Sequence, residues 1–276
     1  MKRILLIISF LGWNFLGFSQ IANPDISDDG MGIAVSPSSM HLSIKPGKTE
    51  IKEVSITNDT KKIIKFNVGF SDFIMGTNGK PSSCESSNKY ALSKYITVTP
   101  TYFELKAGEK RKIKVMVSIP DTAFFAAWTI LTIDQSYDRP KLDVQGNDKT
   151  IAMGVVNTMG FGVYIYQNPP NVTVNNVEIE KFTFETVDSL KLLILNVKNI
   201  GDGIGYSSTY VDLTNLSTGK ITKLYAKKFT ILPQYTRFLK FVIPADIEKG
   251  KYSAVGVLDF GSKEEIKAAE IEFEIP

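Results

Sequence analysis

The sequence has little of the chemistry that most enzymes use. Its 276 residues include one histidine, His41, and one cysteine, Cys84. A zinc site needs several Cys or His ligands, and a histidine-activated nucleophile would have to use His41 as its base. His41 stands between Met40 and Leu42 in a strand-like stretch, so we expect its ring to face solvent. No glycine-rich phosphate loop leads from a strand into a helix. We therefore expect no enzyme, no metal site and no cofactor.

Charge also excludes several classes of partner. The formal net charge is +3, and two of the basic residues, Lys2 and Arg3, belong to the extreme N-terminus. This balance gives no electrostatic basis for binding nucleic acid. Carboxylates are plentiful, but they stand beside lysines, as in Lys52-Glu53, which is typical of solvated strands rather than of a glycosidase pair.

The single cysteine excludes an intramolecular disulfide. Cys84 lies in the small-residue stretch Pro81–Ser87, which predicts a polar loop. Two interpretations stay open for its thiol: an incidental exposed group, or an intermolecular bridge to another chain. In either case the fold depends on apolar cores.

The N-terminus has the pattern of a secretory signal peptide. Lys2-Arg3 precedes an apolar run from Ile4 to Phe18, which polar residues follow from Ser19 onward. We predict a signal peptide over residues 1–19 and a flexible leader over 20–31. A retained membrane anchor is the alternative, although this run is shorter than a typical span. The protein is therefore expected to be exported, to the periplasm or the cell surface, with no membrane span after cleavage.

One sequence motif occurs twice, about sixty residues apart. The first copy joins Ser36–Leu42 through Pro46-Gly47-Lys48 to the alternating stretch Val54–Asn58. The second copy joins Thr99–Leu105 through Ala107-Gly108-Glu109 to Ile113–Pro120. Each copy predicts a short strand, a glycine turn and a strand with one buried face.

Turn signals recur every eight to twelve residues, and no long stretch has helical periodicity. The fold class is therefore all-β, with two immunoglobulin-like antiparallel β-sandwiches in tandem. Pro169-Pro170 is the best boundary. We predict a first domain over residues 32–168, a stiff hinge over 169–171 and a second domain over 172–276.

Two apolar stretches of the first domain are expected to form important strands. Phe124–Leu131 predicts a central strand with Trp128 in the core. Ile151–Tyr166 predicts one long strand, in which three glycines indicate bulges or the close approach of another backbone. Tyr164 and Tyr166 lie on the face opposite Val163 and Ile165, where they either pack in the cleft between the domains or form a stacking platform.

The first domain resembles the N-terminal domain of PapD-like periplasmic chaperones. The motifs that carry the resemblance occur in the order Ser36-Pro37, Lys45-Pro46-Gly47, Val54–Asn58, Val98-Thr99-Pro100, Leu105–Glu109, and a long strand that ends before Pro169. The whole chain also resembles cell-surface proteins that interact with WxL-type wall proteins, which carry two such domains in tandem. These motifs encode turns and alternation, so they specify the fold more strongly than the function.

The resemblance to PapD-like chaperones implies a binding mode. In that family the last long strand of the first domain completes the sheet of a client protein by strand addition. The corresponding residues here, and thus the candidate strand-addition edge, are Met153, Val155, Met159, Phe161 and Val163. Tyr164 and Tyr166 form the candidate cleft. The family also holds the client's C-terminal carboxylate with two basic residues, but no Lys or Arg occurs over 21–44 or 150–180, and Tyr164 is nearest to the expected lysine.

Two functions remain. The first is a non-catalytic exported chaperone or assembly factor that acts by strand addition to a secreted or surface client. The alternative is a cell-surface scaffold or adhesion protein that binds a wall polymer or a protein ligand. Both predict a protein partner and no nucleic acid.

Overall fold

The computed structural model describes residues 30–85, 88–137, 159–172, 176–262 and 265–276. The expected signal peptide, most of the leader, and Met153 and Val155 of the candidate edge lie outside these residues. Within them no helix is long and apolar enough to cross a membrane, and no cluster of three or more acidic, His or Cys side chains could hold a metal ion.

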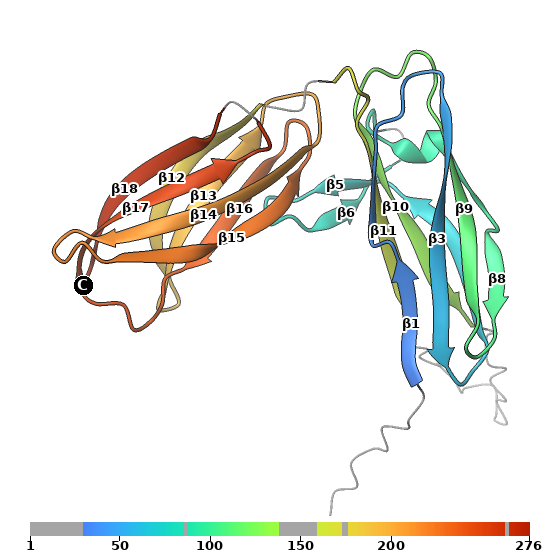
Figure 1. Ribbon diagram of the computed structural model, residues 1–276, viewed down its shortest axis with the longest axis horizontal. Coiled ribbons are helices and arrows are strands. Elements are labelled where there is room, and N and C mark those ends of the chain that lie inside the picture. Colours follow the sequence, from blue (N-terminus) through green and yellow to red (C-terminus); the bar gives the residue numbers. More distant parts are fainter. Residues whose placement is uncertain (1–29, 86–87, 138–158, 173–175, 263–264) are drawn as a thin grey trace, which may run out of the picture.

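The described chain forms two lobes of β-sheet (Figure 1). The first lobe contains β1 (Gly30–Ser36), β2 (Ser39–Leu42), β3 (Thr49–Thr60), β4 (Ile64–Ser71), β5 (Phe73–Met75), β6 (Pro81–Ser83), the 3-10 helix η1 (Leu92–Tyr95), β7 (Ile96–Thr99), β8 (Tyr102–Leu105), β9 (Lys110–Ser118), β10 (Ala127–Ser136) and β11 (Gly160–Gln167). The second lobe contains β12 (Val177–Val187), β13 (Leu190–Asn199), β14 (Gly205–Asn215), β15 (Ile221–Ile231), β16 (Thr236–Val242), β17 (Gly250–Asp259) and β18 (Lys267–Ile275).

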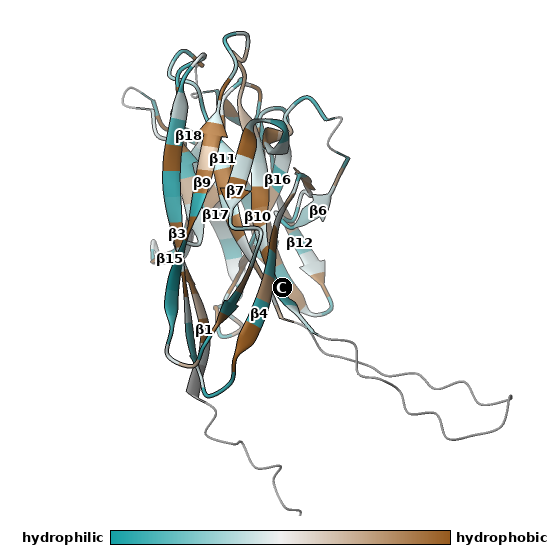
Figure 2. Cartoon of the chain, turned by 90° about the vertical axis from the view of Figure 1, so that its right-hand side faces the viewer, coloured by the Kyte–Doolittle hydropathy of each residue, from teal (hydrophilic) through white to brown (hydrophobic). Residues whose placement is uncertain are grey.

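Each lobe packs two sheets face to face. In the first lobe the strand orders are β1-β3-β9-β7 and β2-β11-β10-β4-β8, and in the second they are β12-β13-β16 and β15-β14-β17-β18. Apolar and polar residues alternate along strands such as β9 and β18, as Figure 2 shows, so one face of each sheet enters a core. The prediction of two all-β sandwiches is confirmed. One pairing departs from the antiparallel rule, because β2 runs parallel to β11.

The repeated sequence motif forms the same arch twice. In each copy a short strand in one sheet, β2 or β8, leads through a glycine turn to a long strand in the facing sheet, β3 or β9. Gly47 and Gly108 occupy these turns with φ angles of 74° and 73°. A positive φ of this size favours glycine, which has no Cβ to clash with the backbone. The Asn58 side chain links the two arches, because its amide donates to the carbonyl oxygens of Leu105 and Lys106 at 3.0 and 3.1 Å.

Strand β10 begins and ends later in the chain than the predicted strand Phe124–Leu131, and it places its tryptophan differently. It begins at Ala127, so Phe124 and Phe125 lie in the preceding connection. Leu131 and Ile133 enter the core of the first sandwich, whereas Trp128 belongs to a separate cluster between the lobes. Trp128 is buried as predicted, but in this cluster rather than among the core residues between the two sheets. Its ring faces outward from the sheet and is buried by residues of both lobes, among them Tyr90 and Tyr235.

Candidate functional site

The edge of β11 is only partly covered by its neighbour β2. The pairing of the two strands begins at Tyr164 with Ser39 and runs to Gln167 with Leu42. The residues that precede β2 do not continue along β11. They form β1, which ends at Ser36 and pairs with β3 in the facing sheet. Among the described residues, no strand therefore covers this side of Gly160–Val163. We call the uncovered side of that segment the open edge.

The hydrogen-bond directions along β11 identify the exposed backbone groups. The Met159 carbonyl oxygen accepts from the Gln135 amide of β10 at 2.8 Å, and the Tyr164 amide donates the other way, to the Ser38 carbonyl oxygen at 3.1 Å. Backbone groups of successive residues in a strand alternate between the two sides. The N–H and C=O groups of Gly160 and Gly162 therefore point out of the open edge.

Apolar side chains surround the open edge. Met159 is 47% exposed, and Phe161 is partly buried against the core of the first lobe. Ile33 and Val35 of the edge strand β1 are also partly buried against that core, from the facing sheet. Val163 is fully buried in its own core, so it supplies backbone to this region and no accessible side chain. Of the five candidate edge residues, only Met159 and Phe161 present described apolar side chains.

The two glycines of the open edge lie close to side chains of β10. A Cβ added to Gly160 would lie 2.6 Å from the Asp134 Oδ1, and one added to Gly162 would lie 3.0 Å from the Ile130 Cγ2. The sequence predicted bulges or a close backbone approach here. The structure instead shows a regular ladder with β10, in which Asp134 and Ile130 lean over the glycines.

Tyr164 and Tyr166 lie between the two lobes. They belong to an interface cluster, in which the buried members are Phe73, Met75, Ala126, Trp128, Tyr166, Ile204 and Leu232, and the partly buried members are Tyr90, Ile130, Tyr164 and Tyr235. The ring of Tyr166 stacks on Tyr164 at 6.1 Å and on His41 at 5.4 Å between centroids. Burial raises the pKa of Tyr166 to about 12. These rings therefore pack as part of the interface.

His41 is on the exposed side of β2, where it also meets the second lobe. Its ring contacts Tyr206 edge-on at 4.5 Å. Burial lowers the pKa of His41, which favours the neutral ring. His41 and Tyr206 line a cavity of about 560 Å³ between the lobes, together with Ser208, Lys228 and Asp259.

The hairpin β5–β6 joins the lobes through its turn (Figure 1). The Thr77 carbonyl oxygen accepts from the Phe238 amide of β16 at 2.8 Å. Nearby, the Asn168 side chain exchanges two hydrogen bonds with the backbone of Ile204, at 3.1 and 3.0 Å. Backbone groups are satisfied across the junction, so the two lobes are docked by polar contacts as well as by the interface cluster.

A basic residue of the second lobe, Arg237, lies beside Tyr166. Arg237 of β16 donates to the Thr230 carbonyl oxygen at 2.8 Å and lies against the turn at Gly79. Desolvation lowers the pKa of Arg237, and the neighbouring Tyr166 opposes that change. Sequence reasoning missed Arg237, because it searched for a cation only in the strands of the first domain.

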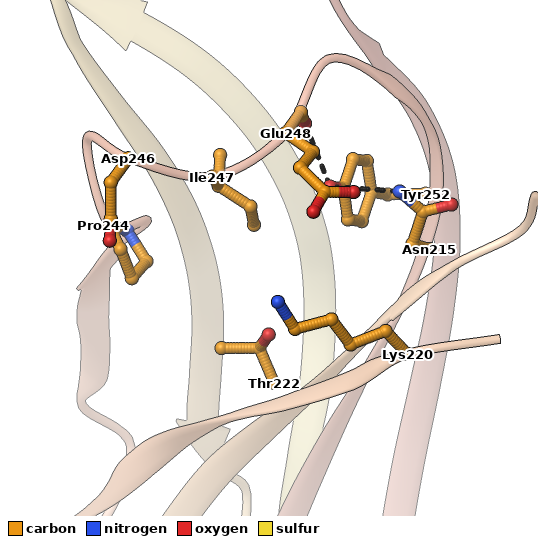
Figure 3. Close-up of a pocket in the computed structure, with 8 residues that line it drawn as sticks. All are labelled: Asn215, Lys220, Thr222, Pro244, Asp246, Ile247, Glu248 and Tyr252. Atoms are coloured by element: carbon orange, nitrogen blue, oxygen red, sulfur yellow. Dashed lines mark hydrogen bonds between the residues drawn. The ribbon is translucent and has the colours of Figure 1, made fainter. Parts of the chain in front are cut away.

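A further cavity of about 240 Å³ lies in the second lobe, away from the open edge (Figure 3). Lys220 points toward the loop that carries Asp246 and Glu248. The Tyr252 hydroxyl donates to the Glu248 carbonyl oxygen at 2.8 Å and accepts from the Asn215 amide at 3.1 Å. Tyr252 is thus used to hold this loop on the sheet.

Comparison with known proteins gives matches among solved structures alone. No protein-family model matches the chain, and no curated protein matches it. The chain is similar to the YadV chaperone, with 14% identity, a TM-score of 0.45, and coverage of 89% of this chain and 100% of that one. It is also similar to the CupB2 chaperone of Pseudomonas aeruginosa, with 10% identity, a TM-score of 0.41, and coverage of 86% of this chain and 98% of that one. A third similar structure is the Escherichia coli chaperone DraB, with 14% identity, a TM-score of 0.40, and coverage of 89% of this chain and 98% of that one. All three of these solved structures are of chaperones.

Proposed function

We propose that this chain is a non-catalytic, exported chaperone or assembly factor that binds a protein client by β-strand addition at the open edge. The observation that carries the proposal is the departure of β2 from β11 before Tyr164, which leaves the N–H and C=O groups of Gly160 and Gly162 without a neighbouring strand among the described residues. An uncovered edge of this kind is a template for another strand.

The surroundings of the open edge support a client strand with alternating apolar side chains. Phe161, Ile33 and Val35 lie on the core side, between the two sheets. A strand that pairs with Gly160–Val163 would place every second side chain toward these residues. Its main-chain hydrogen bonds would supply affinity, and the apolar side chains that it inserts would supply specificity.

A pair of variants at Gly162 tests the proposal. Gly162→Pro adds the proline ring and removes the N–H that points out of the open edge. Gly162→Ala adds only a Cβ and keeps the N–H. Both side chains approach Ile130, so both variants carry similar packing strain. Proline is tolerated at sheet edges, so Gly162→Pro should still fold.

The measurement is quantitative recovery of bound proteins from the envelope fraction of cells that express each tagged variant. We expect one or a few proteins to be retained by the unsubstituted chain and by Gly162→Ala, and to be depleted at least tenfold with Gly162→Pro. Equal recovery with both variants, when circular dichroism shows both folded, would contradict strand addition at this edge. Sedimentation with wall polymer instead of proteins would favour the scaffold function.

A further inference from the structure

A third cavity, of about 600 Å³, lies at the junction between the lobes. Its size is within the range of about 300–1,000 Å³ that is usual for ligand pockets. We call it the junction pocket, and its lining residues are Lys89, Tyr90, Lys94, Tyr95, Phe124, Phe125, Asn171, Val172 and Asp202. They come from the segment around η1, the β9–β10 connection, the segment between the lobes, and the β13–β14 connection. None of them belongs to the open edge.

Four aromatic rings form the apolar wall of the junction pocket. Tyr90 is held in place because its ring stacks on Trp128 at 4.6 Å between centroids. Phe125 packs against the core of the first lobe, but Phe124 is 60% exposed. A large exposed ring beside other rings in a concave site differs from a single surface phenylalanine, and it indicates a surface that a partner covers.

The charged groups of the junction pocket are mostly cationic. The Lys89 Nζ lies 4.5 Å from the centre of the Tyr90 ring, and the Lys94 Nζ donates to the Asn88 carbonyl oxygen at 3.2 Å. Asp202 is the single acid among the lining residues. Within the described chain, neither lysine forms an ion pair with a carboxylate, so both amines are available to an anionic group.

We propose that the junction pocket binds an acidic peptide segment of a partner protein, with one large apolar side chain against the aromatic wall and carboxylates beside Lys89 and Lys94. Rings supply most of the contact energy in such interfaces, and rim charges select the partner. A recess with two lysines does not match an extended anionic surface such as a membrane or a nucleic acid, which needs a broad basic face.

Trp128 reports on the junction pocket because it lies directly behind Tyr90. The chain has one other tryptophan, Trp13, in the expected signal peptide, so Trp128 is the only one in the cleaved chain, and Trp13→Phe makes it the only one in the uncleaved chain. The probe is the peptide acetyl-Glu-Asp-Phe-Asp-Glu-amide, added to the full chain at physiological salt. We expect a saturable change in Trp128 emission with this peptide. Replacement of its acids by lysine, or of its phenylalanine by alanine, should weaken binding at least tenfold.

Two double variants separate a specific site from general charge attraction. Lys89→Ala with Lys94→Ala should weaken binding about tenfold, and Phe124→Ser should do the same without a change of charge. Lys110→Ala with Lys114→Ala removes the same charge from exposed positions on β9 and should leave binding unchanged. Phe124 is exposed, so its variant should fold.

Three results would overturn the proposal. The first is no saturable response to the acidic peptide, and the second is equal weakening by the β9 double variant. The third is binding to phosphatidylglycerol vesicles in place of the peptide. Because the junction pocket and the open edge share no residue, Gly162→Pro should not change peptide binding.

Discussion

Docking of the two lobes depends on the interface cluster, and Leu232 offers the sharpest test of that packing. Leu232 is fully buried and belongs to the interface cluster, whereas the second lobe has its own separate core. Leu232→Ala should therefore weaken docking while leaving both sandwiches folded. Loss of a buried leucine side chain typically costs about 2–5 kcal/mol. With an m-value of about 2 kcal/mol/M in urea, a loss of about 3 kcal/mol corresponds to about 1.5 M.

The assay compares two probes of unfolding in the Trp13→Phe background. Trp128 is 1% exposed, and the interface cluster that buries it includes residues of the second lobe, so its emission should shift to the red when the lobes separate. Far-ultraviolet circular dichroism instead reports the loss of strands. In the parent chain we expect the two transitions to coincide. In Leu232→Ala, Trp128 should become exposed at about 1–2 M lower urea than the loss of strands.

Leu258→Ala is the matched control, because Leu258 is equally buried but lies in the core of the second lobe. This variant should lower both transitions together, since Trp128 is exposed when the second lobe unfolds. The reasoning is refuted if Leu232→Ala leaves both probes coincident at the parent midpoint.

Further predictions concern single groups. Asn58→Ala should lower the free energy of unfolding of the first lobe by about 3 kcal/mol, because it leaves the buried carbonyl oxygen of Leu105 and the part-buried one of Lys106 without this donor. Urea denaturation should show little change for exposed Asn67→Ala. Tyr166, with a pKa raised to about 12 against about 10 unfolded, should keep its proton where the unfolded chain has lost it. Stability should then fall between about pH 10 and 12, and Tyr166→Phe should remove that part of the fall. For His41, whose pKa is lowered by burial, the unfolded chain binds the proton more readily, so stability should fall as pH drops through about 6.5. An NMR titration of the single imidazole checks the direction of this shift.

Much of the fold could be predicted because it is encoded locally. Alternation in Val54–Asn58 and Ile113–Val117 marks strands whose apolar residues are now seen in one core. The turns at Gly47 and Gly108 could be predicted because a positive φ favours glycine. Each of these signals lies within a few residues of the structure it specifies.

The placement of Trp128 shows how a local signal was misread. Leu131 and Ile133 enter the core, so the residues of the same parity face inward and Trp128 faces outward. The alternation of side chains along the strand therefore indicated that Trp128 points away from the sandwich core. The size of its apolar side chain nevertheless favoured a place in the nearest core. The residues of the second lobe that help to bury it, such as Leu232 and Tyr235, follow much later in the sequence.

The sequence offered the packing of Tyr164 and Tyr166 between the lobes as one alternative, but it did not predict their partners or the other contacts there. The bond from Phe238 to Thr77 and the approach of Arg237 to Gly79 join segments that no local pattern relates. The open edge is similar, because it depends on where β2 leaves β11 rather than on the composition of either strand. The proposed WxL-type relationship and the roles of Met153 and Val155 stay predictions.

Amide hydrogen exchange at the open edge tests strand addition most directly. In the free chain, the amides of Phe161 and Val163 face β10 and should exchange slowly, while those of Gly160 and Gly162 should exchange fast. Addition of a client recovered by capture should slow Gly160 and Gly162 at least a hundredfold and leave Phe161 and Val163 unchanged. Client binding with both glycine amides still exchanging at their free rates would contradict the account.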